Sequence, residues 1–181
     1  MVLGSINALG RIDILVNNAG ILSSTQFPSI TINEWHRMLK TNLDSVFYCS
    51  KVVSEHMIEH KSGSIVNIGS SLSSRGGTFN FSGGGPDYVT SKAAIQALSR
   101  SMAQFLAPYG VRVNTLSPGP VDSPMHSGHR NLILKFIPYI PLGRLQVCDD
   151  LVGPLVFLVS DASRFITGQN LHVNGGMIMI D

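Results

Sequence analysis

The stretch that decides the fold is Ile12-Asp13-Ile14-Leu15-Val16-Asn17-Asn18-Ala19-Gly20, an apolar run that stops at a polar turn. Short runs rich in Ile and Val and bounded by turn residues are typical of β-strands. Three further stretches follow the same pattern: Ser64–Ile68 before Gly69-Ser70-Ser71, Val111–Leu116 before Ser117-Pro118-Gly119-Pro120, and Leu171–Asn174 before Gly175-Gly176. The sequence therefore predicts four strands.

Helical patterns separate these strands. A capping box at Thr31 and Glu34 marks the start of a helix that we expect to continue to about His60. Further helices are predicted over residues 86–107 and 149–160. Because parallel strands need crossover helices, the alternation predicts an α/β fold, a Rossmann-like doubly wound parallel sheet in three α/β/α layers. Ligands of such sheets lie beyond the carboxyl ends of the strands, where all four polar turns fall.

Composition narrows the class of protein. The chain has 181 residues, enough for the single domain, residues 1–181, that we predict, and its 44% hydrophobic content excludes a disordered chain. The charged residues behind its net charge of +2 are scattered, so no nucleic-acid-binding stripe is expected. No apolar run approaches the roughly 20 residues of a membrane helix, and we find no signal peptide. We therefore expect a cytoplasmic protein without nucleic-acid or membrane partners.

Cysteine and histidine spacing predicts no metal site. Cys49 and Cys148 lie far apart and form no C-x-x-C pair, which leaves either two free thiols or one disulfide. His126 and His129 are spaced H-x-x-H without a nearby third ligand, so we expect a solvated loop there. The chain also has no P-loop, H-E-x-x-H or G-x-S-x-G motif, which argues against nucleotide-triphosphate, metalloprotease and serine-hydrolase chemistry.

Tyr88 and Lys92 give the first indication of chemistry. They stand four residues apart at the start of a predicted helix and therefore share one face. A phenol loses its proton at about pH 10, and a nearby ammonium favours the phenolate. We therefore expect Lys92 to lower the pKa of Tyr88, so that Tyr88 exchanges a proton with a substrate oxygen near neutral pH. The alternative is an ordinary pair on a helix surface.

The order of the motifs points to a family. Four motifs follow one another along the chain: Asn17-Asn18-Ala19-Gly20, Ser70, Tyr88-x-x-x-Lys92 and Pro118-Gly119. Each lies at a strand end or a helix start on the same side of the predicted sheet. The set resembles the short-chain dehydrogenase/reductase family over essentially the whole chain. The resemblance implies an NAD(P)(H)-dependent enzyme that transfers a hydride between nicotinamide and the carbonyl or secondary alcohol of a small molecule.

The resemblance also implies a role for each matching residue. Tyr88 would be the catalytic acid/base, Lys92 would lower the pKa of the tyrosine and hold the nicotinamide ribose, and Ser70 would bond the substrate carbonyl. Ser71 is the alternative to Ser70. Asn42 would hold a water of the proton relay, unless it is only a helix-surface amide. The cofactor contacts would come from Asn17, Ala19, Gly20, Tyr88, Lys92, Pro118, Gly119 and Ser123.

The beginning of the sequence departs from the family pattern. The family starts with a strand, a Gly-rich phosphate turn and a helix, and no such set precedes Ile12–Val16. We therefore expect an N-terminally truncated domain that lacks about 60 residues, and NAD and NADP stay equally open. Ile12–Val16 would then lie at a sheet edge and invite pairing with another chain. The alternative function is an inactive fragment that associates with a full-length relative.

The later part of the chain bears on the substrate. Three stretches resemble the classical branch of the family, namely Ile140–Arg144, Phe157–Asp161 and Ile166–Gln169. The last strand and its turn, Leu171–Met177, are similar to the ending of 3-oxoacyl-(acyl-carrier-protein) reductases. Sugar and polyol dehydrogenases share much of this pattern, so both substrate classes stay open. The branch implies a homo-oligomer, a tetramer or dimer. Residues 122–137 match a mobile substrate lid or form an ordinary apolar helix, and the long stretch 75–87 reshapes the substrate mouth or bulges outward.

Overall fold

The computed structural model describes residues 2–23, 25–76 and 84–180, apart from the side chains of 127–129. One parallel sheet contains, in this order, β1 (Ile14–Asn17), β2 (Gly63–Ile68), β3 (Val111–Pro118) and β4 (Asn170–Val173). Each strand pairs with the next along the chain, so that Val66 lies opposite both Val16 and Asn114. The four predicted strands and their parallel arrangement are confirmed, with boundaries shifted by one or two residues.

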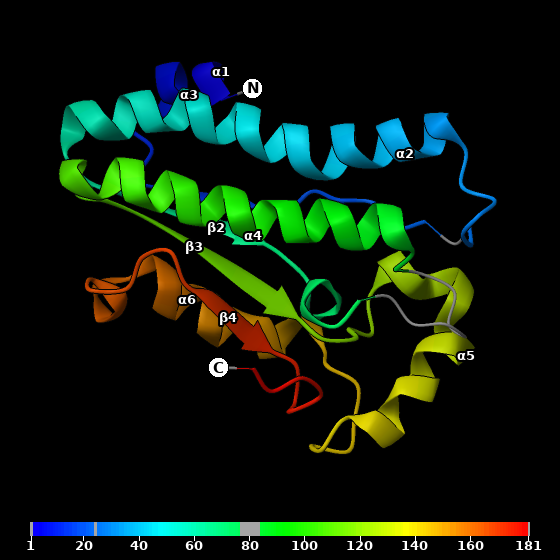
Figure 1. Ribbon diagram of the computed structural model, residues 1–181. Coiled ribbons are helices and arrows are strands. Elements are labelled where there is room, and N and C mark those ends of the chain that lie inside the picture. The colour runs from blue at the N-terminus through cyan, green and yellow to red at the C-terminus, as the bar shows by residue number, and fades with distance from the viewer. Residues whose placement is uncertain (1, 24, 77–83, 181) are drawn as a thin grey trace.

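Helices cover both faces of this sheet (Figure 1). The long helices α3 (Ser45–His60) and α4 (Pro86–Leu106) lie on one face, and α6 (Val152–Val159) lies on the other. The first helix, α1 (Val2–Leu9), packs outside α3. This is the predicted three-layer architecture. The remaining turns are η2 (Ser71–Ser74), η3 (Ala107–Tyr109), η4 (Pro124–His129), α5 (Arg130–Ile133), η5 (Leu134–Tyr139), η6 (Cys148–Leu151) and η7 (Asp161–Ser163).

The alternation of side chains along the strands builds an apolar layer on each face. Ile65 and Val113 belong to the cluster that includes Val53 of α3. Val66, the neighbour of Ile65, points the other way and packs with Leu158 of α6. Successive residues of a strand face opposite sides of a sheet, so a continuous apolar run is buried on both. This packing holds the strand ends, and the turns that follow them, in fixed positions.

The predicted helix over 31–60 is one helical run with a change of pitch. α2 (Ile32–Leu39) begins at the predicted capping box, in which the Glu34 N–H donates to Thr31 Oγ1 (3.2 Å) and the Thr31 N–H donates to Glu34 Oε2 (2.8 Å). A π-helical turn, η1 (Lys40–Asp44), joins α2 to α3. A π turn inserts one extra residue per turn and is frequent at functional sites. Here it carries Asn42, which is fully buried.

The structure also bears on the predictions about the sheet edge, the cysteines, membrane helices and the long stretch 75–87. β1 forms an edge of the sheet, as expected, and its Ile14 side chain is 47% exposed; pairing with another chain stays a prediction. Cys49 and Cys148 are free thiols, which decides against the disulfide. Within the described ranges, no helix combines the length and the apolar character needed to cross a membrane. Most of the long stretch 75–87, namely residues 77–83, lies outside the described residues.

Candidate functional site

The carboxyl ends of β2 and β3 bring several predicted site residues to one cavity. Ser70, Tyr88, Pro118 and Gly119 all line it, and its volume is about 70 Å³. Ser70 follows β2, Tyr88 lies in the first turn of α4, and Pro118 ends β3. These segments are far apart in the sequence, and the parallel sheet places them together at the edge where such folds bind ligands.

Ser70 and Tyr88 are joined by a side-chain hydrogen bond. Both residues are buried, with 7% and 9% of their surface exposed. Burial raises the pKa of the Tyr88 phenol above its ordinary value, and the hydrogen bond with Ser70 lowers it by a smaller amount. The expectation of a lowered Tyr88 pKa is therefore wrong for this structure. The physical reason is desolvation, which disfavours the phenolate more strongly than the neighbouring groups favour it.

Lys92 lies over the tyrosine, with Nζ 5.9 Å from the centroid of the Tyr88 ring. Only 5% of Lys92 is exposed, so the alternative of a surface helix pair is wrong. Burial lowers the pKa of the Lys92 ammonium from 10.5 to about 8. Its Nζ donates a hydrogen bond to the carbonyl oxygen of Ile68 (2.7 Å), the last residue of β2. The ammonium is thus held against the strand end that precedes Ser70.

Gly20 places the turn after β1 close to the Lys92 ammonium and to Asn42. A Cβ atom on Gly20 would lie 3.3 Å from Asn42 Oδ1 and 3.6 Å from Lys92 Nζ. Asn42 in turn holds both backbone groups of Ile21: Oδ1 accepts its N–H (2.8 Å) and Nδ2 donates to its carbonyl (3.0 Å). Asn42 is 0% exposed, so the alternative of a helix-surface amide is wrong. The η1 turn therefore fixes the course of the Gly20 turn.

Three predicted cofactor residues are placed differently. The Asn17 amide faces the interior, where Nδ2 donates to Ser50 Oγ (3.0 Å) and Asn67 Oδ1 (2.8 Å). Ala19 is exposed, and Ser123, the residue before η4, is half-buried. None of the three lines the cavity. Their predicted contacts with a cofactor stay predictions, and the Asn17 side chain is already engaged within the fold.

Ser71 belongs to a different set of contacts from Ser70. Its Oγ donates to the carbonyl of Ser117 (3.1 Å) and accepts from Asn174 Nδ2 (3.3 Å). The same oxygen lies 3.2 Å from His172 Nδ1. Ser71 is therefore occupied by β3 and by the segment around β4, whereas Ser70 is bonded to Tyr88. Ser70 Oγ also accepts from the Leu72 N–H (3.2 Å), so both serines are engaged, and what distinguishes Ser70 is its contact with Tyr88.

The tautomer of His172 follows from its neighbours. Asn170 Oδ1 accepts a hydrogen bond from Ser117 Oγ (2.6 Å), which leaves Asn170 Nδ2 to donate to His172 Nε2 (3.0 Å). Because Nε2 accepts, the proton of the neutral ring is on Nδ1 and is donated to Ser71. Burial lowers the pKa of His172, which agrees with a neutral ring. His172 was not predicted as a site residue, since no motif in Leu171–Asn174 indicates a contact with Ser71.

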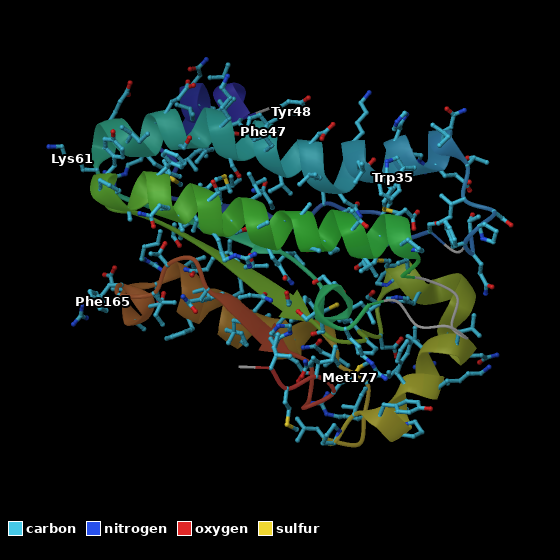
Figure 2. All side chains as sticks on the ribbon, in the orientation of Figure 1. Trp35, Phe47, Tyr48, Lys61, Phe165 and Met177 are labelled. Carbon is cyan, nitrogen blue, oxygen red and sulfur yellow. The ribbon has the colours of Figure 1, made fainter. Side chains whose placement is uncertain are left out.

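Apolar side chains complete the cavity. Ile133 and Phe136 come from the segment predicted as a lid, and Met177 follows β4 (Figure 2). His126 also lines the cavity, so the expectation of a solvated loop is wrong for that residue. The other lining residues were not predicted, because isolated apolar residues in loops follow no periodic pattern; these are Leu22, Leu72 and Pro120.

A larger hollow, of about 620 Å³, lies at the other end of the strands, where the strands begin. Residues that line it include Ile14, Gly63 and Val111, which are the first residues of β1, β2 and β3. None of the predicted site residues lies there. Parallel sheets bind ligands at the carboxyl ends of their strands, so the candidate site is the smaller cavity.

The comparisons with known proteins agree with this geometry. Residues 2–178 match the family model described as Enoyl-(Acyl carrier protein) reductase. The chain is 37% identical over 175 residues to the 3-oxoacyl-(acyl-carrier-protein) reductase FabG of Escherichia coli (strain K12), covering 94% of this chain and 68% of that relative. It is 36% identical over 171 residues to the same reductase of Buchnera aphidicola subsp. Baizongia pistaciae, with the same two coverages.

Solved structures give the same result at the level of the fold. The crystal structure of a short-chain type dehydrogenase/reductase from Mycobacterium marinum matches with a TM-score of 0.91 and 32% sequence identity. The match covers 97% of this chain and 70% of that chain. A family model spanning nearly all residues and relatives above 30% identity point to one family. The chain belongs to the short-chain dehydrogenase/reductase family.

Proposed function

We propose that the chain is an NAD(P)-dependent oxidoreductase that interconverts a carbonyl group and a secondary alcohol. The observation that carries the proposal is the hydrogen-bonded pair of Ser70 and Tyr88 on the cavity, with Lys92 over the tyrosine ring. The pair directs two hydroxyl groups at one small space. Two hydroxyl donors that converge on a carbonyl oxygen stabilise the negative charge that develops there during reduction.

The roles of the residues follow from their protonation. Tyr88 gives its proton to the substrate oxygen while the carbonyl carbon accepts a hydride, and Ser70 donates a hydrogen bond to the same oxygen. The nicotinamide, when bound, supplies that hydride. Together the hydride and the proton turn the carbonyl into a neutral alcohol. The raised pKa of Tyr88 keeps the phenol protonated at neutral pH, which is the form that reduction requires.

The surroundings of Gly20 fit a dinucleotide cofactor. Without a side chain, the Gly20 backbone sits so close to Asn42 and Lys92 that a Cβ would crowd the space, and a ligand can approach it equally closely. Among the described residues, Lys92 Nζ donates only to Ile68. An ammonium has three donors, so Lys92 has two left for the hydroxyl groups of a ribose. These contacts of Gly20 and Lys92 suit NAD and NADP equally.

The lining of the cavity supports an apolar substrate. Apart from Ser70, Ser71, Tyr88 and His126, its side chains are apolar, which suits an acyl chain better than a sugar or polyol with many hydroxyl groups. We therefore propose a 3-oxoacyl thioester-like substrate. The volume of about 70 Å³ is small for such a molecule, since ligand sites usually measure roughly 300–1,000 Å³. We propose that the segment 124–139, which carries Ile133 and Phe136, moves to admit it.

We further propose a cytoplasmic homo-oligomer, a tetramer or dimer. Support comes from α3, on which Phe47 and Tyr48 are exposed and pack edge-to-face with ring centroids 5.9 Å apart (Figure 2). Aromatic residues are enriched at protein–protein interfaces relative to the rest of the surface. The edge strand β1, with its exposed Ile14, supports the alternative that this chain is inactive and associates with a full-length relative.

The variant Tyr88→Phe tests the proposed activity. It removes the proton donor but keeps the ring, so turnover of an acetoacetyl thioester with NADPH or NADH should fall by about 10²- to 10⁴-fold. Cofactor affinity, measured by fluorescence titration, should stay nearly unchanged. Tyr109→Phe, which alters an exposed tyrosine of η3, is the matched control and should keep full turnover.

Two results would decide against the proposal. Wild-type turnover in Tyr88→Phe would remove Tyr88 from the reaction. An unmodified chain that shows no saturable binding of either cofactor and no turnover would instead favour the inactive, associating chain. Its oligomeric state and its binding to a full-length relative would then be measured by light scattering.

A further inference from the structure

A cluster of metal-binding side chains lies outside the cavity. At the end of α3, His56, Glu59 and His60 offer ligand atoms that all lie within 4.8 Å of one another. Residues three and four positions apart share one face of a helix, so a single turn presents all three. The prediction of no metal site rested on the spacing of the cysteines and of His126 and His129, and the H-x-x-E-H spacing at 56–60 was not predicted as a metal-binding pattern.

The backbone of α3 prepares His60 as a ligand. His60 Nδ1 lies 2.8 Å from the carbonyl oxygen of His56. A carbonyl only accepts, so Nδ1 carries the proton of the neutral ring and Nε2 keeps its lone pair. A backbone carbonyl that fixes the tautomer of an imidazole is the usual partner of a metal-binding histidine. Nε2 is therefore the nitrogen of the neutral His60 ring that keeps a lone pair for a metal.

His56 is coupled to the strand β1. Its Nε2 accepts a hydrogen bond of 3.3 Å from the backbone N–H of Ile12, two residues before β1 begins. A metal bound at Nε2 would replace this hydrogen bond directly. A metal bound at Nδ1 would move the ring proton to Nε2, which then could no longer accept from Ile12. Whichever nitrogen is used, metal binding releases the Ile12 N–H.

The donor set and the local charge select the class of ion. Two imidazoles and a carboxylate suit zinc, cobalt, nickel and copper ions, whereas magnesium and calcium prefer oxygen ligands. The carbonyl groups at the C-terminal end of α3 add negative partial charge next to the cluster. The positive charge of Lys61 does not offset this partial charge at close range, because its side chain extends outward past the end of the helix (Figure 2). Three protein ligands and one water complete the tetrahedron that zinc favours.

We propose that His56, Glu59 and His60 form a site for one divalent transition-metal ion of the zinc class, and that binding the ion releases the backbone N–H of Ile12. The metal site lies near the ends where the strands begin, and the cavity lies where they finish, since Ile12 precedes β1 and Ser70 follows β2. The proposal therefore does not depend on the proposed activity, and either can fail without the other.

Zinc titration of the full 181-residue chain tests the site. Calorimetry with zinc chloride should show saturable binding of one ion per chain, and magnesium chloride should show none. His60→Ala should weaken zinc binding by more than about tenfold, because even changes in outer-shell partners weaken metal affinity that much. His36→Ala, which removes an exposed histidine of α2, is the matched control and should bind like the unmodified chain.

Amide hydrogen exchange at Ile12 tests the coupling. Saturating zinc should accelerate exchange of the Ile12 N–H in the unmodified chain and leave it unchanged in His60→Ala. Weak binding at several sites that persists in His60→Ala would identify adventitious zinc and overturn the site. Saturable binding without any change at Ile12 would overturn the coupling.

Discussion

Lys92 gives a prediction in which stability and proposed function oppose each other. Burial lowers the pKa of its ammonium from 10.5 to about 8. At about 1.4 kcal/mol for each pH unit, the charge costs about 3 kcal/mol of stability at neutral pH. Lys92→Met keeps a long side chain without the charge and loses the charged hydrogen bond to Ile68, worth about 2 kcal/mol. We therefore expect Lys92→Met to raise the free energy of unfolding at pH 7 by about 1 kcal/mol.

The pH dependence gives this prediction its sign. Below about pH 8, Lys92 is protonated in the folded and unfolded chains alike, and the full penalty is present. Between about pH 8 and 10.5, the unfolded chain keeps a proton that the folded chain has released, so the stability of the unmodified chain rises with pH. Lys92→Met lacks this rise. Its advantage should therefore shrink as the pH approaches 10.5.

Urea denaturation at pH 7 and pH 10 measures the effect in both chains. Lys51→Met, which removes an exposed lysine of α3, is the control and should differ from the unmodified chain equally at both pH values. A stability difference for Lys92→Met that is the same at pH 7 and pH 10 would refute the reasoning. So would a destabilised variant at pH 7, because the burial penalty would then be smaller than the lost hydrogen bond.

Three further changes follow from contacts around the site. Asn42→Ala leaves the N–H and carbonyl of Ile21 unpaired and should lower the urea-measured stability by about 3 kcal/mol, whereas the exposed control Asn33→Ala should change little. His172→Phe removes the donor to Ser71 and should lower stability by about 1–3 kcal/mol, with a larger effect on kcat than on KM for the proposed reduction. Gly69→Ala places a Cβ 2.6 Å from Ser117 Oγ and should lower the melting temperature through an overpacking cost of about 1–3 kcal/mol.

Each of these has an outcome that would contradict it. An unchanged stability of Asn42→Ala would show that water replaces the amide at Ile21. An unaltered kcat in His172→Phe, with stability lowered, would reduce the Ser71 network to a purely structural role. A normal melting temperature for Gly69→Ala would show that β3 yields to the new methyl group at little cost.

Local patterns in the sequence were sufficient for the elements and their layers. Alternation around Ile65 and Val66 predicts a strand buried on both faces, and the pair packs on opposite sides of the sheet as expected. Thr31 and Glu34 predict the start of α2 because both capping partners lie within four residues. The parallel arrangement of the strands follows from crossover rules that apply to any chain of this pattern.

The site was predicted less completely. The spacing of Tyr88 and Lys92 places them on one helix face, yet the sign of the Tyr88 pKa shift was wrong. That sign depends on desolvation by residues distant in the sequence, which no spacing reports. Asn42 has the same explanation, since its burial arises from the η1 turn and from the docking of Ile21. By contrast, the histidine cluster of α3 is local, and its spacing at 56–60 could have revealed it.

The sequence by itself determined the parallel α/β fold, the family and the set of polar turns at one sheet edge. These depend on periodicity and on neighbours within a few residues, and such interactions are encoded locally. Only the tertiary structure decided that Tyr88 is bonded to Ser70 and buried, that the Asn17 amide faces inward, and that His172 reaches Ser71. Those outcomes depend on which distant side chains exclude water from each group, and that is settled when the layers pack.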